Sequence, residues 1–167
     1  MEYFDLCTVG RKPLGKKVQR GTKLNNNEYH LVVMAIIQNE NREVLLTRRS
    51  ENKIAAGLWE CTAGSVLAGE NSRDAIIREV KEEIGINVDV FGDPITCYSE
   101  ENALFDIWII QIKNKIQDLV LQIEEVDDAK YANLYEIKKI ISKGAATKSL
   151  HELLKLNKSG IISIKDK

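Results

Sequence analysis

The sequence predicts a mixed α/β or α+β sandwich, because two kinds of hydrophobic pattern occur along it. Apolar, β-branched runs such as LVVMAIIQ (31–38) are typical of buried strands. Apolar residues four positions apart, as in Ile76, Val80 and Ile84, are typical of a helix that packs on a sheet. Since such segments alternate in mixed order, we expect helices to cover a mixed β-sheet.

The size and composition of the chain suit one soluble domain spanning residues 1–167. Residues 1–28 are polar and rich in turn formers, so we describe them as an N-terminal extension. Lys and Arg number 24 against 25 Asp and Glu, which gives a net charge of -1. No basic field therefore favours nucleic acid as a partner.

The remaining elements follow from periodicity and turn signals. Residues 39–41 predict a turn, so the strands on either side of it are expected to form a hairpin. Asn71 or Ser72 can cap a helix over 72–84, and Gly85 suits its C-terminal end. The expected strands cover 31–38, 42–49, 58–64, 87–98, 103–112, 117–123 and 161–164, and two further helices cover 134–143 and 147–156.

Nothing in the sequence indicates a membrane or an oxidising compartment. No apolar run approaches the roughly 20 residues of a membrane span, and the start MEYFDLCTVG does not resemble a secretory signal. Cys7, Cys61 and Cys97 are scattered and odd in number, which suits a reducing cytoplasm. We therefore expect a cytoplasmic protein whose cysteines are small buried or half-buried thiols.

Three acidic residues on the 72–84 helix carry the strongest chemical signal. Glu79, Glu82 and Glu83 stand at i, i+3 and i+4, which places their carboxylates on one side of the helix, roughly 120° from its apolar stripe, where they can face a cleft. Like charges this close repel, and a divalent cation removes that cost. Oxygen ligands without His or Cys favour Mg²⁺, with Mn²⁺ possible, over zinc. The competing interpretation is an ordinary solvated acidic face.

The segment GSVLAGENSRDAIIREVKEEIGI (64–86) resembles the Nudix box, G-x5-E-x7-R-E-U-x-E-E-x-G-U with U apolar, without a departure. The matching residues are Gly64, Glu70, Arg78, Glu79, Val80, Glu82, Glu83, Gly85 and Ile86. The resemblance to this MutT-like superfamily implies an α/β/α sandwich in which the box forms a loop, a helix and a loop.

The resemblance also implies roles for the residues of the box. The three glutamates would bind Mg²⁺ together with a backbone carbonyl at Ala63 or Gly64. Arg78 would orient Glu79, and Glu70 would pair with Arg78. The metal would lower the pKa of a water that attacks phosphorus.

The general base stays open between two interpretations. Glu79 is one candidate, and a glutamate outside the box serves in some members, which points to Glu124 or Glu125. The competing interpretation of the latter pair is that both are solvated loop acids.

A second resemblance lies upstream, in YHLVVMAII and LLTRRSENKIAAGLWE, which are similar to isopentenyl diphosphate isomerases and to the isomerase-like Nudix hydrolases of bacteria. It implies that Arg49 and Lys53 contact a diphosphate, with Arg48 as a possible helper. His30 is expected to be structural, and Trp59 to belong to the core or a pocket wall.

Isomerisation itself is not favoured. It needs a cysteine a few residues after the tryptophan, where this chain has Gly64, and Cys61 stands in the wrong place. We expect hydrolysis of a diphosphate bond in a nucleoside diphosphate linked to another moiety, or in a related small organic diphosphate. An isomerase and a non-catalytic nucleotide-binding module are the alternatives. The expected partner is a small molecule, and the chain a monomer or homodimer.

Overall fold

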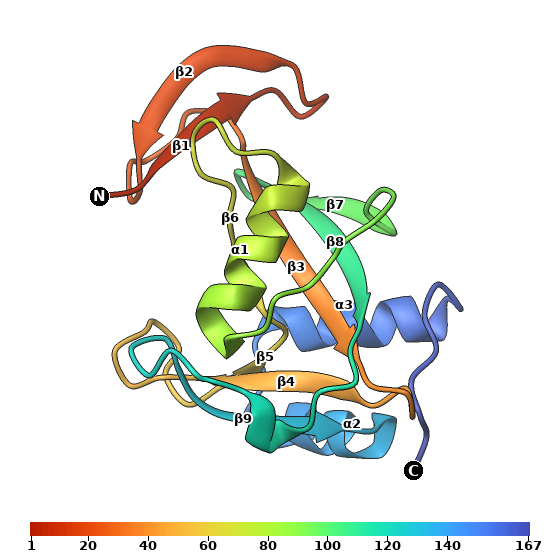
Figure 1. Ribbon diagram of the computed structural model, residues 1–167. Helices are drawn as coiled ribbons and strands as arrows, with labels where there is room; N and C mark the ends of the chain where they lie inside the picture. The colour runs from red at the N-terminus through yellow and green to blue at the C-terminus, as the bar shows by residue number, and fades with distance from the viewer.

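The computed structural model describes residues 1–167 as a mixed sheet with helices on its faces and a separate N-terminal hairpin (Figure 1). The strands are β1 (Tyr3–Cys7), β2 (Pro13–Gln19), β3 (His30–Gln38), β4 (Val44–Arg49), β5 (Trp59–Glu60), β6 (Ala63–Ser65), β7 (Thr96–Glu100), β8 (Ala103–Gln111) and β9 (Val126–Ala132). The helices are α1 (Ser72–Ile84), α2 (Leu134–Ser142) and α3 (Lys148–Lys158), with a 3₁₀ turn at Ile116–Asp118.

The main sheet has the strand order β5-β4-β3-β8-β7, with β6 also paired to β3 and β9 to β4. Strands β3 and β8 run parallel, in register from His30 opposite Ala103 to Gln38 opposite Gln111. The other pairs are antiparallel, so the sheet is mixed as expected.

The expected hairpin over 31–49 is wrong beyond its turn. Strands β3 and β4 share a single pair, Gln38 opposite Val44, and then diverge. The edges of β3 are occupied by β8 and β6, whereas those of β4 are occupied by β9 and β5. Strands β5 and β6 therefore continue two different branches of the sheet, and the segment between them crosses from one branch to the other.

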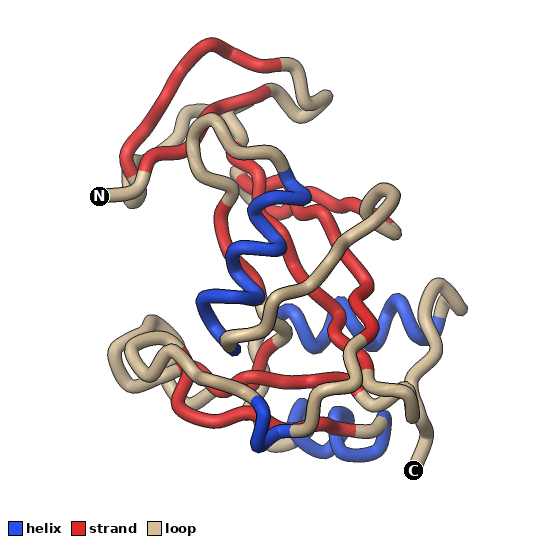
Figure 2. The backbone as a smooth tube through the Cα atoms, viewed as in Figure 1, coloured by secondary structure: helices blue, strands red, loops and turns tan.

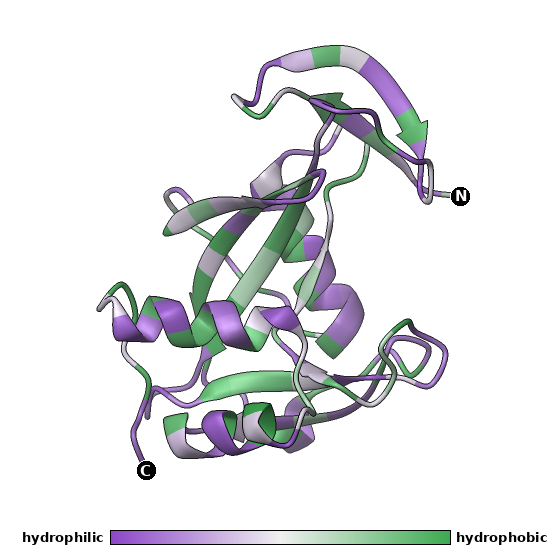
Figure 3. Cartoon of the chain, turned by 180° about the vertical axis from the view of Figure 1, so that it is seen from behind, coloured by the Kyte–Doolittle hydropathy of each residue, from purple (hydrophilic) through white to green (hydrophobic).

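Two hydrophobic clusters lie on opposite faces of this sheet, because side chains alternate along β3. Val33 and Ala35 point to the α1 face, where Ile76, Val80 and Ile84 of that helix are fully buried. Met34 and Ile36 point to the opposite face, which is covered by α2 and α3 (Figure 3). The molecule is thus an α/β/α sandwich.

Helix α1 begins and ends where the sequence predicts. The Asn71 side chain accepts a hydrogen bond from the backbone N–H of Asp74 at 2.9 Å, which satisfies one free donor of the first turn. Gly85 adopts the left-handed conformation, φ 74°, and its N–H donates to Lys81 O at 3.0 Å. These two caps fix the axial position of the acidic residues.

The strand predicted over 117–123 is wrong, although its alternating side chains do pack inward. The backbone N–H groups of Val120 and Gln122 donate to the carbonyls of Ile84 and Glu83 at 3.0 and 3.1 Å. This segment therefore satisfies the free carbonyls at the end of α1 instead of joining the sheet.

Two other predicted strands are also wrong in whole or part. Residues 87–95 form no strand, although the Ile95 N–H donates to Ile107 O of β8 at 2.8 Å, and β7 begins only at Thr96. The tail 161–164 forms no strand, although Ile162 and Ile164 are buried on the α2 and α3 face. One-sided burial of an extended segment gives the same alternation as a strand, which misled the prediction.

Three elements were not predicted. Strand β9 is short of large apolar residues, since its sequence is VDDAKYA. Strands β1 and β2 form a two-stranded hairpin within the polar residues 1–28 (Figure 2).

The cysteines agree with expectation only in part. Cys97 is exposed, contrary to expectation, whereas Cys7 and Cys61 are buried.

Candidate active site

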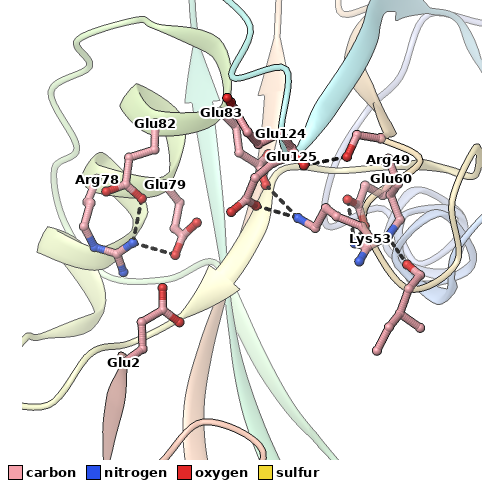
Figure 4. A network of polar contacts seen from close by, with 12 residues as sticks. Glu2, Arg49, Lys53, Glu60, Arg78, Glu79, Glu82, Glu83, Glu124 and Glu125 are labelled. Carbon is pink, nitrogen blue, oxygen red and sulfur yellow. Dashed lines mark hydrogen bonds and ion pairs between the residues drawn. The ribbon is translucent and has the colours of Figure 1, made fainter.

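Arg78 of α1 is the centre of the box contacts. Its Nε and Nη2 donate to the two carboxylate oxygens of Glu70 at 2.9 Å each, and Nη2 also donates to Ser65 O at 3.0 Å. Its Nη1 contacts Glu79 at 2.7 Å and Glu82 at 3.0 Å (Figure 4). The guanidinium thus connects the loop before α1 to two acids of the helix.

Glu79 lies directly against the backbone of β6. A Cβ atom added to Gly64 would stand 2.0 Å from the Glu79 Cδ, so only glycine leaves room for this carboxylate. Burial raises the pKa of Glu79, and the neighbouring Arg78 acts in the opposite direction. Helix α1 and strand β6 therefore place a carboxylate and a backbone segment in contact, as a shared metal site would require.

Glu83 is the most unusual acid of the cluster. It is 1% exposed, and neither carboxylate oxygen has a hydrogen-bond partner. Burial, followed by the charge of Glu60, raises its pKa to about 8. The nearest cation is Lys53, whose Nζ lies 4.0 Å from Oε1. Lys53, and Thr62 beside it, act against this rise in pKa only in part. A buried carboxylate with so little compensation is costly, so the position suits a cation that completes it.

The three acids of the helix differ in exposure. Glu79 and Glu83 are buried with the apolar stripe, whereas the side chain of Glu82 is 50% exposed and turns outward to Arg78. No three Asp, Glu, His or Cys side chains are spaced to hold an ion in this arrangement. Glu82 would therefore have to leave Arg78 to join the other two.

Lys53 and Glu125 come from two loops that contact each other. The Lys53 Nζ donates to Glu125 Oε2 at 2.7 Å (Figure 4). Ser50 joins the same loops, since its N–H donates to Glu125 O at 2.9 Å and its Oγ to Glu124 O at 2.6 Å. The structure thus brings Lys53, Glu83 and Glu125 together, whereas Glu124 contributes its backbone.

Arg49 has a different environment from Lys53. Its Nη1 contacts both carboxylate oxygens of Glu60, at 2.8 and 2.7 Å, and its Nε donates to Ile54 O at 2.7 Å. Glu60 is buried, and that burial raises its pKa. Sequence reasoning missed Glu60; its one signal is a charged residue inside the strand expected over 58–64.

The other upstream residues lie away from the acids. His30 stacks on Phe4, with ring centroids 5.0 Å apart. The Trp59 ring faces Lys130 Nζ at 4.3 Å, on the α2 and α3 face of the sheet. Cys61 is fully buried, and burial raises the pKa of its thiol to about 12, so it is a poor proton donor or acceptor.

The donor set has a clear chemical character. The acids and the Gly64 backbone supply only hard oxygen ligands, and Glu83 lacks the partners that a buried carboxylate needs. Glu79, Glu82, Glu83 and the Gly64 carbonyl could hold a divalent cation. Together, the sandwich fold and the segment that carries Arg78 and these acids define a class of α/β/α proteins with a loop–helix acidic site.

Comparison with known proteins identifies the family within that class. Residues 28–153 match the model of the NUDIX domain. A Nudix hydrolase of Listeria monocytogenes is 38% identical over 147 residues, which cover 86% of this chain and 87% of the relative. The chain belongs to the Nudix hydrolase family.

Solved structures agree on the fold. A Deinococcus radiodurans protein has a TM-score of 0.77 at 18% identity, covering 92% of this chain and 98% of that one. The NUDIX domain of Shewanella oneidensis NrtR, crystallised with ADP ribose, has a TM-score of 0.64 at 16% identity, covering 89% and 96%. No helix of the present structure has the length and apolarity of a membrane span.

Proposed function

We propose that the chain catalyses the metal-dependent hydrolysis of a diphosphate bond. The substrate would be a nucleoside diphosphate linked to another moiety, or a related small organic diphosphate. The observation that carries the proposal is the buried Glu83 carboxylate, which has only a 4.0 Å contact with Lys53 and lies beside Glu79 on the box helix of a Nudix hydrolase. A protein without a use for that charge would gain stability by replacing it.

Mg²⁺ or Mn²⁺ is the proposed cofactor, held by Glu79, Glu82, Glu83 and the Gly64 carbonyl. When bound, the ion would neutralise phosphate oxygens and make a bound water more acidic. Arg78 holds Glu79 at 2.7 Å and is itself fixed by Glu70, so it would orient the ligand rather than touch the substrate.

Lys53 is the better candidate for contacting the diphosphate than Arg49. Its close partner Glu125 is 40% exposed, so that ion pair is exchanged at less cost than the pair of Arg49 with the buried Glu60. A bound divalent cation would compensate Glu83, which lies 4.0 Å from Lys53. If Arg49 left Glu60, it would strand a buried carboxylate without a partner. Arg49 would therefore position its loop, while Lys53 would turn from Glu125 to the substrate.

The release of Lys53 would also free Glu125 for proton transfer. A carboxylate at the mouth of the acidic cluster could accept the proton of the attacking water. Glu79 is the alternative base, although Arg78 already engages one of its oxygens.

Hydrolysis of a panel in the presence of Mg²⁺ tests this function. The panel should contain ADP-ribose, which occupies the related NrtR domain, dinucleoside polyphosphates and oxidised nucleotides. We expect turnover of at least one compound with cleavage between two phosphorus atoms, detected by ³¹P NMR in ¹⁸O-labelled water. Tight binding without turnover would support a non-catalytic nucleotide-binding module instead.

The variant Glu82→Gln should lower kcat at least about a hundredfold while leaving the fold intact. Glu82 is exposed and its pair with Arg78 lies at the surface, so the free energy of unfolding should change little. Glu40→Gln is the matched control, because Glu40 lies in an exposed turn with only a 3.6 Å pair to Lys113. Near-normal turnover of the Glu82 variant would remove the metal assignment.

A further inference from the structure

The N-terminal hairpin lies outside residues 28–153, the part of the chain that matches the NUDIX domain. We propose that this hairpin contributes to the active site, because its residue Asp5 positions the loop that leads into α1 (66–71, the box loop). The inference rests on the proposed function, since it assigns Asp5 a role in that reaction.

Two hydrogen bonds join β1 to the box loop. The backbone N–H of Ala68 donates to Tyr3 O at 2.8 Å, and that of Gly69 donates to Asp5 Oδ2 at 2.7 Å. Gly69 adopts a positive φ of 86°, so the loop turns sharply at this point. A carboxylate that accepts a backbone N–H forms one of the stronger hydrogen bonds in proteins.

The loop held in this way carries Glu70, the partner of Arg78. Glu70 follows Gly69 directly, and its Oε2 accepts the backbone N–H of Leu67 at 3.0 Å. The same carboxylate holds the Arg78 guanidinium through two contacts of 2.9 Å. Asp5 is therefore connected to Arg78 through its hydrogen bond to Gly69, the peptide link from Gly69 to Glu70, and the hydrogen bonds of Glu70 to Arg78, which in turn contacts the acids.

The hairpin is itself firmly fixed to the sandwich, as a positioning element must be. Arg11 forms a two-point ion pair with the buried Asp106 of β8. Cys7 and Tyr29 exchange backbone hydrogen bonds of 2.8 and 2.9 Å. Figure 1 shows the hairpin lying across the loop that leads into α1. Since an isolated two-stranded hairpin is marginal in water, these anchors allow Asp5 to act as a fixed acceptor.

The test compares Asp5→Ala, Asp5→Asn and Thr8→Ala in the full chain. Asp5→Ala removes the acceptor, so we expect kcat to fall about tenfold with KM little changed. Asp5→Asn keeps an oxygen in place and should restore most of kcat. Thr8 accepts a hydrogen bond from Lys12 within the hairpin turn and does not touch the box loop, so Thr8→Ala controls for loss of hairpin stability.

Hydrogen exchange of the Gly69 N–H and the Arg78 Nε–H, followed by NMR, measures how firmly the box loop and Arg78 are held, and it needs no substrate. We expect both groups to lose protection in Asp5→Ala and to keep it in Thr8→Ala. An unchanged kcat in Asp5→Ala, or faster exchange at Gly69 alone, would overturn the inference. Equal losses in the Asp5→Ala and Thr8→Ala variants would also overturn it, because they would indicate general loosening of the hairpin.

The same measurements separate this inference from the proposed function. If the wild-type protein hydrolyses nothing in the panel, the proposed function fails, and the exchange of the two groups still decides whether Asp5 positions Arg78. If the wild type is active and Asp5→Ala matches it, only the role of Asp5 is lost.

Discussion

At the scale of single residues, the buried Glu83 carboxylate lowers the stability of the metal-free fold, whereas in the proposed reaction the same carboxylate would bind the metal. Its burial raises the pKa to about 8, so the folded protein without metal prefers the neutral form. The unfolded chain ionises the same group near about 4.3. A raised pKa means that this group's contribution to stability is present at low pH and is lost as the pH rises through 8.

Glu83→Gln should therefore stabilise the metal-free protein in alkaline solution. In EDTA at pH 8.5 we expect the free energy of unfolding to exceed that of the wild type by roughly 2 kcal/mol or more, because an uncompensated buried charge is removed. Near pH 5 the difference should shrink, because ionisation of Glu83 in the unfolded chain then stabilises the unfolded state by much less. Urea unfolding at the two pH values measures both quantities. A difference that is independent of pH would show that Glu83 is not a strained buried charge.

At the scale of elements, the contact between β6 and α1 determines where the ligands lie. Gly64 leaves the space that the Glu79 carboxylate fills, and the tightness of that contact makes it a sensitive point. A methyl group added at Gly64 would meet the end of the flexible Glu79 side chain, which can move aside without disturbing the backbone. The carboxylate, however, cannot stay where it is.

Gly64→Ala should therefore separate activity from stability. We expect kcat to fall at least about a hundredfold, because displacing a ligand by roughly 1 Å has that effect, while the free energy of unfolding changes by less than about 1 kcal/mol. Gly10→Ala is the matched control, since its added Cβ would make only an ordinary 3.8 Å contact with Thr8. Full activity of Gly64→Ala would show that Glu79 does not need this position.

The elements also show how far sequence reasoning reaches. Helix α1 and strands β3 and β8 could be predicted because each has its own local periodicity and turn or cap signals. Strand β9 could not, since its sequence VDDAKYA becomes a strand only through pairing with β4, which is far away in the chain. The strand predicted over 117–123 shows the opposite error. Its alternating apolar residues reflect burial of one side of the segment, and its backbone does not pair with a strand.

At the scale of the whole molecule, the box and the family were evident from sequence, but the arrangement of the site was not. Spacing alone placed three acids on one side of a helix, whereas packing on the sheet buried Glu79 and Glu83 and left Glu82 outside. Asp5 joins the site from a segment that is remote in sequence and carries no motif, whereas Glu60 lies just before the box and gives no sign in the sequence of its contact with Arg49. Their roles depend on tertiary contacts, which only the folded chain provides.

The proposed chemistry depends on a divalent cation that compensates the buried acids. Titration calorimetry with Mg²⁺ tests this most directly, on the wild type and on Glu83→Gln, with and without inorganic pyrophosphate. We predict that the wild type takes up Mg²⁺ with the release of protons at pH 7.5, since Glu83 must ionise, and that Glu83→Gln binds the ion at least about tenfold more weakly. Wild-type protein that takes up no Mg²⁺ or Mn²⁺ under either condition would contradict the account.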